Sequence, residues 1–146
     1  MIDATALRRF IYEEIFANGT PPSSGRIAGQ FGVDTPEARG SLAAMKIGKT
    51  VLVHPKTGEV WMAGPFAAAP TSYEVARDGR RWWGNCAWDM LGVATLVGFP
   101  VTVRGSCEDC GDSMTLKIES REQKMPDWIV HLLVPARNWY DDVGFT

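Results

Sequence analysis

Apolar residues in the first part of the chain recur at helical spacing and then give way to a short β-rich pattern. Leu7, Phe10, Ile11 and Ile15 lie three or four positions apart, which predicts a helix that ends near residue 18. The same reasoning predicts helices over residues 26–31 and about 35–47, and paired strands over residues 51–53 and 60–62. Three short helices followed by a β-hairpin are the pattern of a winged helix. We therefore interpret residues 1–63 as a winged-helix-like module.

The pattern changes after a linker rich in Pro and Ala at residues 64–71. Beyond it, β-rich runs alternate with turn residues, and one helix is predicted over residues 86–97, capped by Gly84 or Asn85. The β-rich runs cover residues 72–76, 82–83, 101–104, 114–118 and 128–134. These elements predict one β-sheet packed against the helix. The expected fold class is α+β, with a second domain over residues 64–146.

Composition narrows the function classes without selecting one. The 146 residues are 45% hydrophobic and 22% charged, with a net charge of −2. A chain of this length buries enough surface to fold without a metal ion or disulfide bonds. No apolar run approaches the ~20 residues that span a bilayer, so no membrane partner is expected. Three cysteines, an odd number without a secretory signal, predict free thiols in a reducing compartment, the cytoplasm. The sequence does not indicate an oligomeric state.

The charge of the helical module argues against the usual use of a winged helix, which is DNA binding through its third helix. Residues 1–60 hold seven Lys or Arg against six Asp or Glu, and the candidate recognition stretch carries Arg39 and Lys46 as its cations. A DNA reader is expected to be more basic than this. A winged-helix regulator that senses metal or organometal through its thiols stays open as the alternative function.

The densest chemistry in the chain is the segment that begins at Cys86. Cys86 and Asp89 are three residues apart, so on a helix they share one face. A thiol in the first turn meets unpaired backbone N–H groups, which predicts a lowered pKa. Desolvation and the nearby thiolate predict a raised pKa for Asp89 and make it a candidate proton donor. Trp82, Trp83 and Trp88 are expected to keep water from the thiol. A buried structural cysteine with a surface or capping aspartate is the plainer reading of the pair.

A second thiol pair, Cys107 and Cys110, forms a C-x-x-C in a predicted turn between two strands. Zinc would need further ligands, and His54 and His131 fall on a hairpin and a predicted strand far apart in the sequence. A redox C-x-x-C normally opens a helix after a strand, which fits this position poorly. Cys107 and Cys110 therefore remain candidate metal ligands in a knuckle-like turn.

The segments around these residues resemble the alkylmercury lyases, or organomercurial lyases. The resemblance is carried by Pro65-Phe66, Pro70-Thr71, Tyr73-Glu74-Val75, the run from Asn85 to Gly92, the strand Val101-Thr102-Val103, Cys107, and the run from Trp139 to Thr146. It covers residues 64–146 closely and residues 1–63 in outline. The family's architecture is a helical, winged-helix-like module before a catalytic core that contains a β-sheet.

The resemblance implies cleavage of a carbon–mercury bond in a small organomercurial. Cys86 matches the first catalytic cysteine of the family and Asp89 matches its proton donor, while Cys107 matches a position that is structural there. Thiolates bind mercury, which is soft, and a carboxylic acid protonates its carbon substituent. The products are a hydrocarbon and Hg(II) held by thiols. No resident cofactor is implied, and external thiols release the product.

The chain departs from the family in one respect, because the second catalytic cysteine of the family lies just beyond the segment at Thr146. Three explanations are open. Cys107 or Cys110 supplies the second thiolate, or the protein is a non-catalytic relative that binds mercurials, or the gene continues past Thr146. For the last we expect a selenocysteine codon after codon 146, which translation reads as a stop. The nucleotide sequence beyond that codon tests it.

Overall fold

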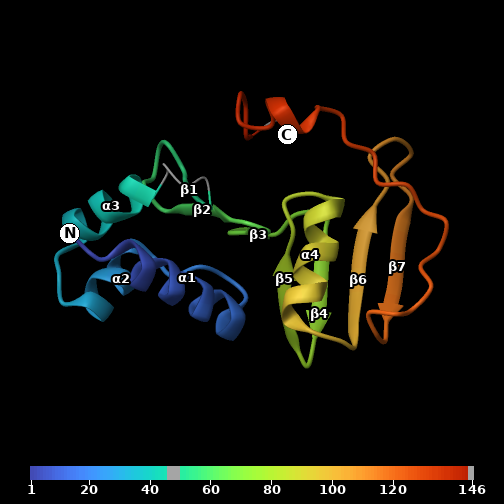
Figure 1. Ribbon diagram of the computed structural model, residues 1–146, viewed down its shortest axis with the longest axis horizontal. Coiled ribbons are helices and arrows are strands. Elements are labelled where there is room, and N and C mark those ends of the chain that lie inside the picture. The colour runs from blue at the N-terminus through green and yellow to red at the C-terminus, as the bar shows by residue number, and fades with distance from the viewer. Residues whose placement is uncertain (46–49, 145–146) are drawn as a thin grey trace.

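Three helices and a small antiparallel sheet form the N-terminal half of the protein (Figure 1). The computed structural model describes residues 1–45 and 50–144. The elements of this half are α1 (Ala4–Asn18), α2 (Ser24–Phe31), α3 (Thr35–Ala44), β1 (Val51–Val53), β2 (Val60–Ala63) and β3 (Phe66–Ala67). The predicted order of three helices and a hairpin is confirmed, whereas its description as a winged helix stays a prediction. Residues 46 and 47, predicted to end the third helix, lie outside the described residues.

Local sequence signals set the ends of these helices. Asp3, Ser23 and Asp34 each accept a hydrogen bond from the backbone N–H three residues ahead, which satisfies a free donor at the helix start. Gly19 and Gly32 end α1 and α2 in the left-handed conformation, with φ of 81° and 65°. The helix boundaries of the N-terminal half were therefore readable from residue type.

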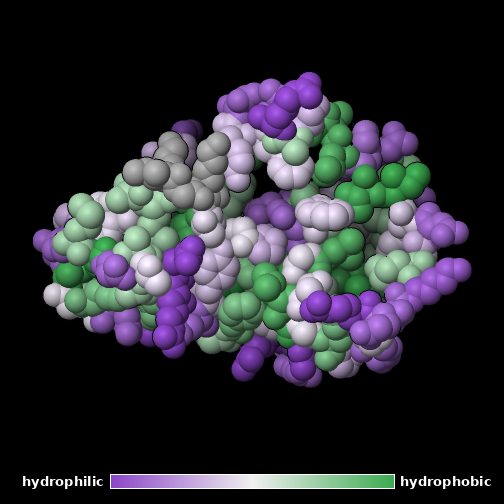
Figure 2. Space-filling view, viewed as in Figure 1, coloured by the Kyte–Doolittle hydropathy of each residue, from purple (hydrophilic) through white to green (hydrophobic). Residues whose placement is uncertain are grey.

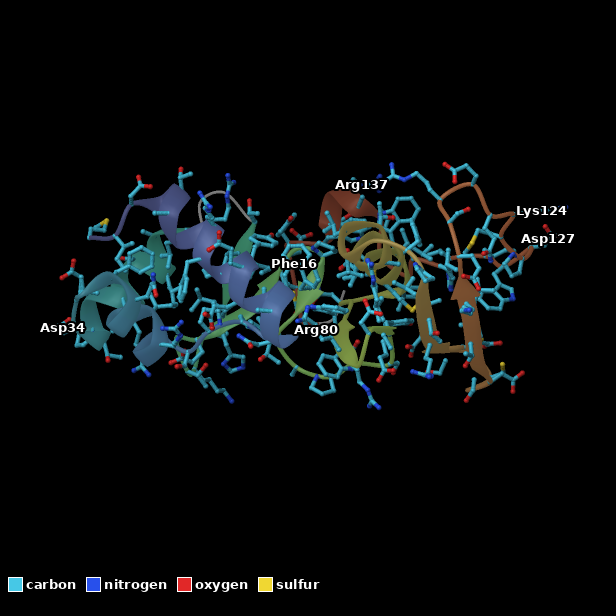
Figure 3. The ribbon with its side chains drawn as sticks, turned by 90° about the horizontal axis from the view of Figure 1, so that it is seen from below. Phe16, Asp34, Arg80, Lys124, Asp127 and Arg137 are labelled. Carbon is cyan, nitrogen blue, oxygen red and sulfur yellow. The ribbon has the colours of Figure 1, made fainter. Side chains whose placement is uncertain are left out.

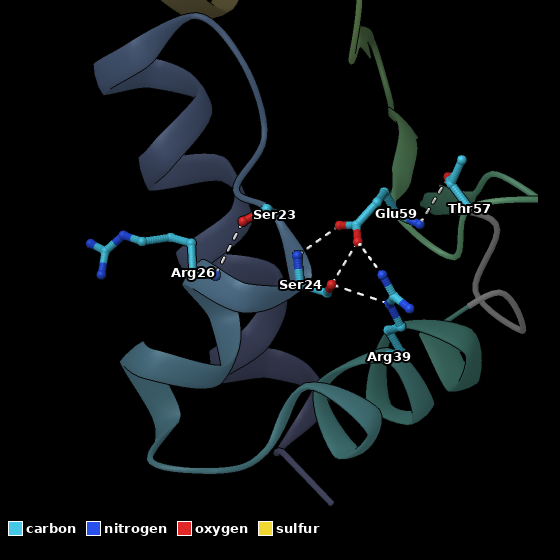
Figure 4. A network of polar contacts seen from close by, with 6 residues as sticks. All are labelled: Ser23, Ser24, Arg26, Arg39, Thr57 and Glu59. Atoms are coloured by element: carbon cyan, nitrogen blue, oxygen red, sulfur yellow. Dashed lines mark hydrogen bonds and ion pairs between the residues drawn. The ribbon is translucent and has the colours of Figure 1, made fainter.

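Glu59 ties the β1–β2 hairpin to the helices (Figure 4). Its carboxylate accepts hydrogen bonds from the backbone N–H and the hydroxyl of Ser24, both at 2.6 Å, and from the Arg39 guanidinium at 3.1 Å. Burial opposes the ionisation of Glu59, but these donors outweigh it and lower its pKa. Because Arg39 is engaged inside the protein, this cation of α3 already has a partner, which weakens the case for DNA binding further.

The second half is a four-stranded antiparallel sheet with one helix on its face. Its strands follow the order β5-β4-β6-β7. The elements are β4 (Glu74–Arg77), β5 (Arg80–Trp83), α4 (Ala87–Val97), β6 (Val101–Ser106) and β7 (Ser113–Ile118). Asp78 and Gly79, with φ of 49° and 76°, make the tight turn between β4 and β5. The α+β fold class is confirmed.

The alternation of buried and partly buried residues along the strands explains how α4 packs on one face of the sheet. Val75 pairs with Trp82 on one side and Val103 on the other, and all three are buried. Met90 and Val93 of α4 are also buried, and α4 contacts β4, β5 and β6. The residues that flank Val75 along its strand are only partly buried, as expected where one face is covered.

The two halves share one hydrophobic core. Phe66 of β3 makes edge-to-face contacts with Tyr12 and Phe16 of α1, at centroid separations of 6.2 and 5.5 Å. The Trp82 indole N–H donates to the Ile15 carbonyl at 2.8 Å in a buried position. Figure 3 shows Phe16 at this junction. The division into residues 1–63 and 64–146 remains a prediction, because the buried cluster runs through both parts.

The last predicted β-run of the second half, residues 128–134, is not a strand. The chain after β7 passes along the outer side of the sheet, beyond β7, where Figure 3 labels Lys124 and Asp127. Ile129 and Leu133 are 91% and 73% exposed, and Figure 2 shows apolar side chains gathered over this side of the molecule. These residues have the apolar, β-branched composition of a strand, but none of the described strands pairs with them through hydrogen bonds, and a strand needs such a partner.

None of the described helices has the length and hydropathy needed to cross a membrane.

Candidate active site

The first turn of α4 lies directly against the chain that leaves β5. A Cβ on Gly84 would stand 2.5 Å from the Met90 nitrogen and 2.9 Å from the Asp89 carbonyl carbon, so glycine is needed for this approach. The Gly84 N–H donates to the Tyr73 carbonyl at 2.9 Å, and its own carbonyl accepts from the Thr71 hydroxyl at 2.6 Å. The start of α4 is thereby fixed at the end of the sheet where β4 begins and β5 ends.

Cys86 and Asp89 lie in contact at this helix start. Cys86 is the N-cap of α4, and its sulfur accepts the Asp89 backbone N–H at 3.5 Å. Its thiol also lies close enough to the Asp89 carboxyl group for each group to influence the pKa of the other. The Asn85 amide donates to Asp89 Oδ2 at 3.0 Å and to the Pro65 carbonyl at 3.1 Å, which fixes the rotation of the carboxyl group. The structure therefore brings together the two residues that the sequence singled out.

Burial raises the pKa of both members of this pair. For Asp89, desolvation outweighs the hydrogen bonds from Asn85 and Cys86 that favour the carboxylate. For Cys86, desolvation comes first, and the negative charge of Asp89 adds to it, against backbone N–H groups that favour the thiolate. A protonated thiol beside a carboxyl group of raised pKa holds one transferable proton between sulfur and oxygen.

Three sequence-based expectations about Cys86 are wrong. The cap of α4 is Cys86 itself, not Gly84 or Asn85, because its sulfur takes the role that a Ser or Asp oxygen plays at other helices. The pKa of Cys86 is raised instead of lowered, since desolvation exceeds the effect of the helix N-terminus. Trp88 is 61% exposed and does not keep water from the thiol. The raised pKa expected for Asp89 is confirmed with desolvation as its cause, whereas the interaction with Cys86 lowers this pKa and does not raise it as expected.

Cys107 and Cys110 lie in the β6–β7 hairpin turn, as the sequence predicted. Cys107 donates its N–H to the Asp112 carbonyl and accepts the Gly111 N–H, both at 2.8 Å, which closes the turn. All three cysteines of the protein are free thiols. Among the described residues, no group of three or more His, Cys, Asp or Glu could hold a metal ion. A zinc site built from this turn is therefore not supported by its ligand count.

Tyr73 connects the two thiol sites and was missed by the sequence reasoning. Its hydroxyl donates to Glu108 Oε1 at 2.8 Å, within the hairpin turn, and its carbonyl accepts from Gly84. Burial raises the pKa of Tyr73 to about 12, and the charges of Glu108, Cys86 and Cys107 contribute. Nothing in residue type marked Tyr73, because its role depends on strand β4 lying between β5 and β6.

An apolar cavity of about 140 Å³ opens beside the start of α4. It begins at Ala87, the residue after Cys86, and is closed on the far side by the segment that follows β7. Its walls are mainly aliphatic and thioether side chains: Ala87, Met90, Leu91, Val103, Gly105, Met114, Met125, Pro126, Trp128, Ile129 and Val130. The segment that failed to form a strand thus supplies one wall of this cavity.

The fold and the site define an α+β protein with a thiol and a carboxyl group paired at the start of a core helix. The family model for alkylmercury lyase, MerB, matches residues 66–146, which include this pair and the hairpin thiols. The chain belongs to the alkylmercury lyase family.

Among solved structures, the chain is similar to one described as the crystal structure of the mercury-bound form of MerB2. The two share 15% sequence identity with a TM-score of 0.58, and the match covers 80% of this chain and 55% of that chain. At this identity the likeness shows the fold. The chain therefore spans about half the length of the solved structure that it matches. None of the curated proteins matches the chain.

Proposed function

We propose that this protein cleaves the carbon–mercury bond of a small organomercurial by protonolysis. The observation that carries the proposal is the placement of Cys86 and Asp89 together at the start of α4, where the Asp89 N–H donates to the Cys86 sulfur at 3.5 Å, within the segment that matches the family. Both groups have raised pKa values through burial. The pair can therefore take up mercury at sulfur and keep the released proton beside it.

In the first step, Cys86 replaces the anion X⁻ on the substrate R–Hg–X. The sulfur–mercury bond forms, X⁻ leaves, and the thiol proton passes to the neighbouring Asp89 carboxylate. Mercury is soft and prefers sulfur over the oxygen ligands nearby, so the exchange is favourable. Asp89 ends this step as a carboxylic acid, which its raised pKa favours.

In the second step, the Asp89 proton moves to the carbon of R while the carbon–mercury bond breaks. The hydrocarbon R–H leaves, and Hg(II) remains between the Cys86 sulfur and the Asp89 carboxylate. Asn85 holds the carboxyl group in position through its hydrogen bond of 3.0 Å. A further thiol then displaces the carboxylate from the metal and carries the product away.

The apolar cavity is the proposed location of the organic group R. Its volume of about 140 Å³ is close to that of an engineered apolar cavity of about 150 Å³ that binds benzene. Phenyl and short alkyl groups fit this space, and it begins at Ala87, next to the thiol. We expect phenylmercury to be a better substrate than mercurials with two fused rings.

A reducing compartment, the cytoplasm, is the proposed location, because all three thiols are free. The regulator alternative is tested by duplex DNA binding and its salt dependence. We expect no binding beyond a weak, non-specific level, because Arg39 of α3 is paired with Glu59.

Asp89→Asn tests the proposed chemistry. It keeps an oxygen acceptor for Asn85 but has no acidic proton, so we expect the release of benzene from phenylmercury acetate, with excess thiol present, to fall roughly 100-fold or more. Binding of phenylmercury to Cys86 should persist. Benzene measured by gas chromatography gives the rate, and mass spectrometry of the intact adduct gives the binding.

The matched control is Asp3→Asn, which removes the same charge from another helix start while keeping an effective cap. Its rate should equal that of the unmodified protein. If Asp89→Asn turns over within a factor of three of the control, Asp89 is not the proton donor. Unchanged turnover in Cys86→Ser would reject the site altogether.

A further inference from the structure

Strand order places the two thiol sites at the same end of the main sheet. The chain leaves β5 toward Cys86 and leaves β6 toward Cys107, and β4 lies between these strands. Glu74, at the start of β4, pairs with Trp83 at the end of β5 and with Arg104 near the end of β6. Two strand spacings amount to about 10 Å. The sites are neighbours, but Tyr73 at the start of β4 stands between them.

The hairpin turn presents Cys107 and Cys110 as a pair. The Gly111 N–H donates to the Cys107 carbonyl and the Cys107 N–H donates to the Asp112 carbonyl, both at 2.8 Å, so both cysteines lie within one tight turn. Cys110 is exposed and Cys107 is partly exposed, so the pair is open to solutes. The bond from Tyr73 to Glu108 holds this turn against β4.

The number of ligands selects the kind of metal ion. Tetrahedral zinc takes four protein ligands in a structural site, and no third His, Cys, Asp or Glu joins this pair within the described part of the chain. Hg(II) is satisfied by two thiolates in a linear arrangement and is soft. A pair of adjacent, accessible thiols without further ligands therefore suits Hg(II) better than zinc.

We propose that Cys107 and Cys110 form a chelating two-thiol site for Hg(II), separate from the Cys86–Asp89 site, that accepts the metal after the carbon–mercury bond is cleaved. Binding of Hg(II) by the pair stands on the hairpin geometry alone. The acceptor role rests on the proposed function.

The transfer is a thiol exchange that needs no oxidant. The Cys107 and Cys110 thiols each form a bond to mercury and the Cys107 thiol releases its proton to solvent, while the bonds from mercury to the Cys86 sulfur and the Asp89 carboxylate break. The proton of the Cys110 thiol goes to Cys86, which regenerates the thiol beside the Asp89 carboxylate. Both sites lie at one end of the sheet, about two strand spacings apart, so the exposed hairpin turn must approach Cys86 for the exchange to occur.

The first experiment uses HgCl₂ alone and does not depend on turnover. Cys86→Ser leaves the hairpin pair, while the double variant Cys107→Ser/Cys110→Ser leaves Cys86. After loading with one equivalent of Hg(II), each is dialysed against millimolar glutathione, and the mercury retained is measured by atomic absorption. We expect Cys86→Ser to retain close to one equivalent and the double variant to retain less than a fifth of that, because chelation by two joined thiols resists a monothiol.

Cys110→Ser, made in the Cys86→Ser background, controls for the possibility that the double variant loses mercury because it misfolds. It changes one exposed side chain, and circular dichroism verifies its fold. Its retention should fall to the level of the double variant. If Cys86→Ser retains no more mercury than these variants, the two-thiol site is rejected.

The second experiment tests transfer under single-turnover conditions with phenylmercury acetate and no added thiol. The unmodified protein should move its Hg(II) to the hairpin, as found by alkylation of a freed Cys86 and protection of Cys107. In Cys110→Ser, Cys86 should stay blocked until glutathione is added. A free Cys86 in Cys110→Ser without glutathione overturns the acceptor role. Absence of benzene in every sample contradicts the proposed function but leaves the result with HgCl₂ intact.

Discussion

Two thiol sites at one end of the sheet differ in almost every physical property. Cys86 caps a core helix, is partly buried beside a carboxyl group, and has a raised pKa because of desolvation. Cys107 lies in an exposed hairpin, where the backbone N–H groups of Cys110 and Asp109 lower its pKa. The reactive group is a cysteine thiol in both sites. The comparison teaches that burial and nearby N–H groups, not the thiol itself, decide which sulfur ionises more readily.

Among substitutions that should affect the two thiol sites differently, Gly84→Ala is expected to have the largest effect. The added Cβ meets the backbone of Met90 and Asp89 at 2.5 to 2.9 Å, so α4 must shift, at a cost of about 2–3 kcal/mol in the free energy of unfolding. The Cys86 site should be disrupted and the Cys107 site left intact. Urea unfolding gives the stability, and benzene release gives the activity.

Gly40→Ala is the matched control, because a Cβ at this helical position meets nothing within 4 Å. It should stabilise the protein by up to about 1 kcal/mol through helix propensity. Equal stabilities for the two variants would contradict the proposed role of Gly84.

A smaller effect is expected on the pH dependence of stability in Asp89→Asn. The pKa of Asp89 is raised on folding, so ionisation costs the folded state more than the unfolded one. The unmodified protein therefore loses stability as the pH rises from below the unfolded pKa to above the folded one, and stays lower beyond it. Asp89→Asn removes this loss and should be more stable near neutral pH by up to about 1 kcal/mol, allowing for solvent screening.

Urea unfolding at several pH values measures this difference, which should vanish at acidic pH. A constant difference across the whole range would mean that Asp89 is not raised in pKa. The variant expected to be more stable is the one expected to be inactive, which sharpens the view that the Cys86 site is strained for its chemistry.

The smallest expected effect is a difference between the alkylation rates of the Cys107 and Cys86 sulfurs. Because the thiolate is the nucleophile, Cys107 should react with iodoacetamide several-fold faster than Cys86 at pH 7, and reach its plateau rate at a lower pH. Peptide mapping by mass spectrometry gives both rates in one sample. Faster modification of Cys86 would contradict the raised pKa of Cys86 and the lowered pKa of Cys107.

Tyr73→Phe extends the same measurement. It removes the hydrogen bond from the Tyr73 hydroxyl to Glu108 and should change the alkylation rate of Cys107 while leaving the fold intact.

The chain by itself determined the helices, the caps in the N-terminal half, the hairpins and the pairing of Cys86 with Asp89, because these depend on local spacing and residue type. Asp3, Ser23 and Asp34 act within three residues of themselves, and positions i and i+3 share a helix face in any context. The sequence also indicated the family, through residues that lie close together along the chain.

Only the tertiary structure decided the rest. The sign of the pKa shift of Cys86 depends on how much water the core leaves at the helix start. The run at residues 128–134 has strand composition, yet it lines a cavity because no partner strand pairs with it. Tyr73 stands between two thiol sites because β4 lies between β5 and β6. Each of these depends on segments distant in the sequence, whose proximity no local pattern encodes.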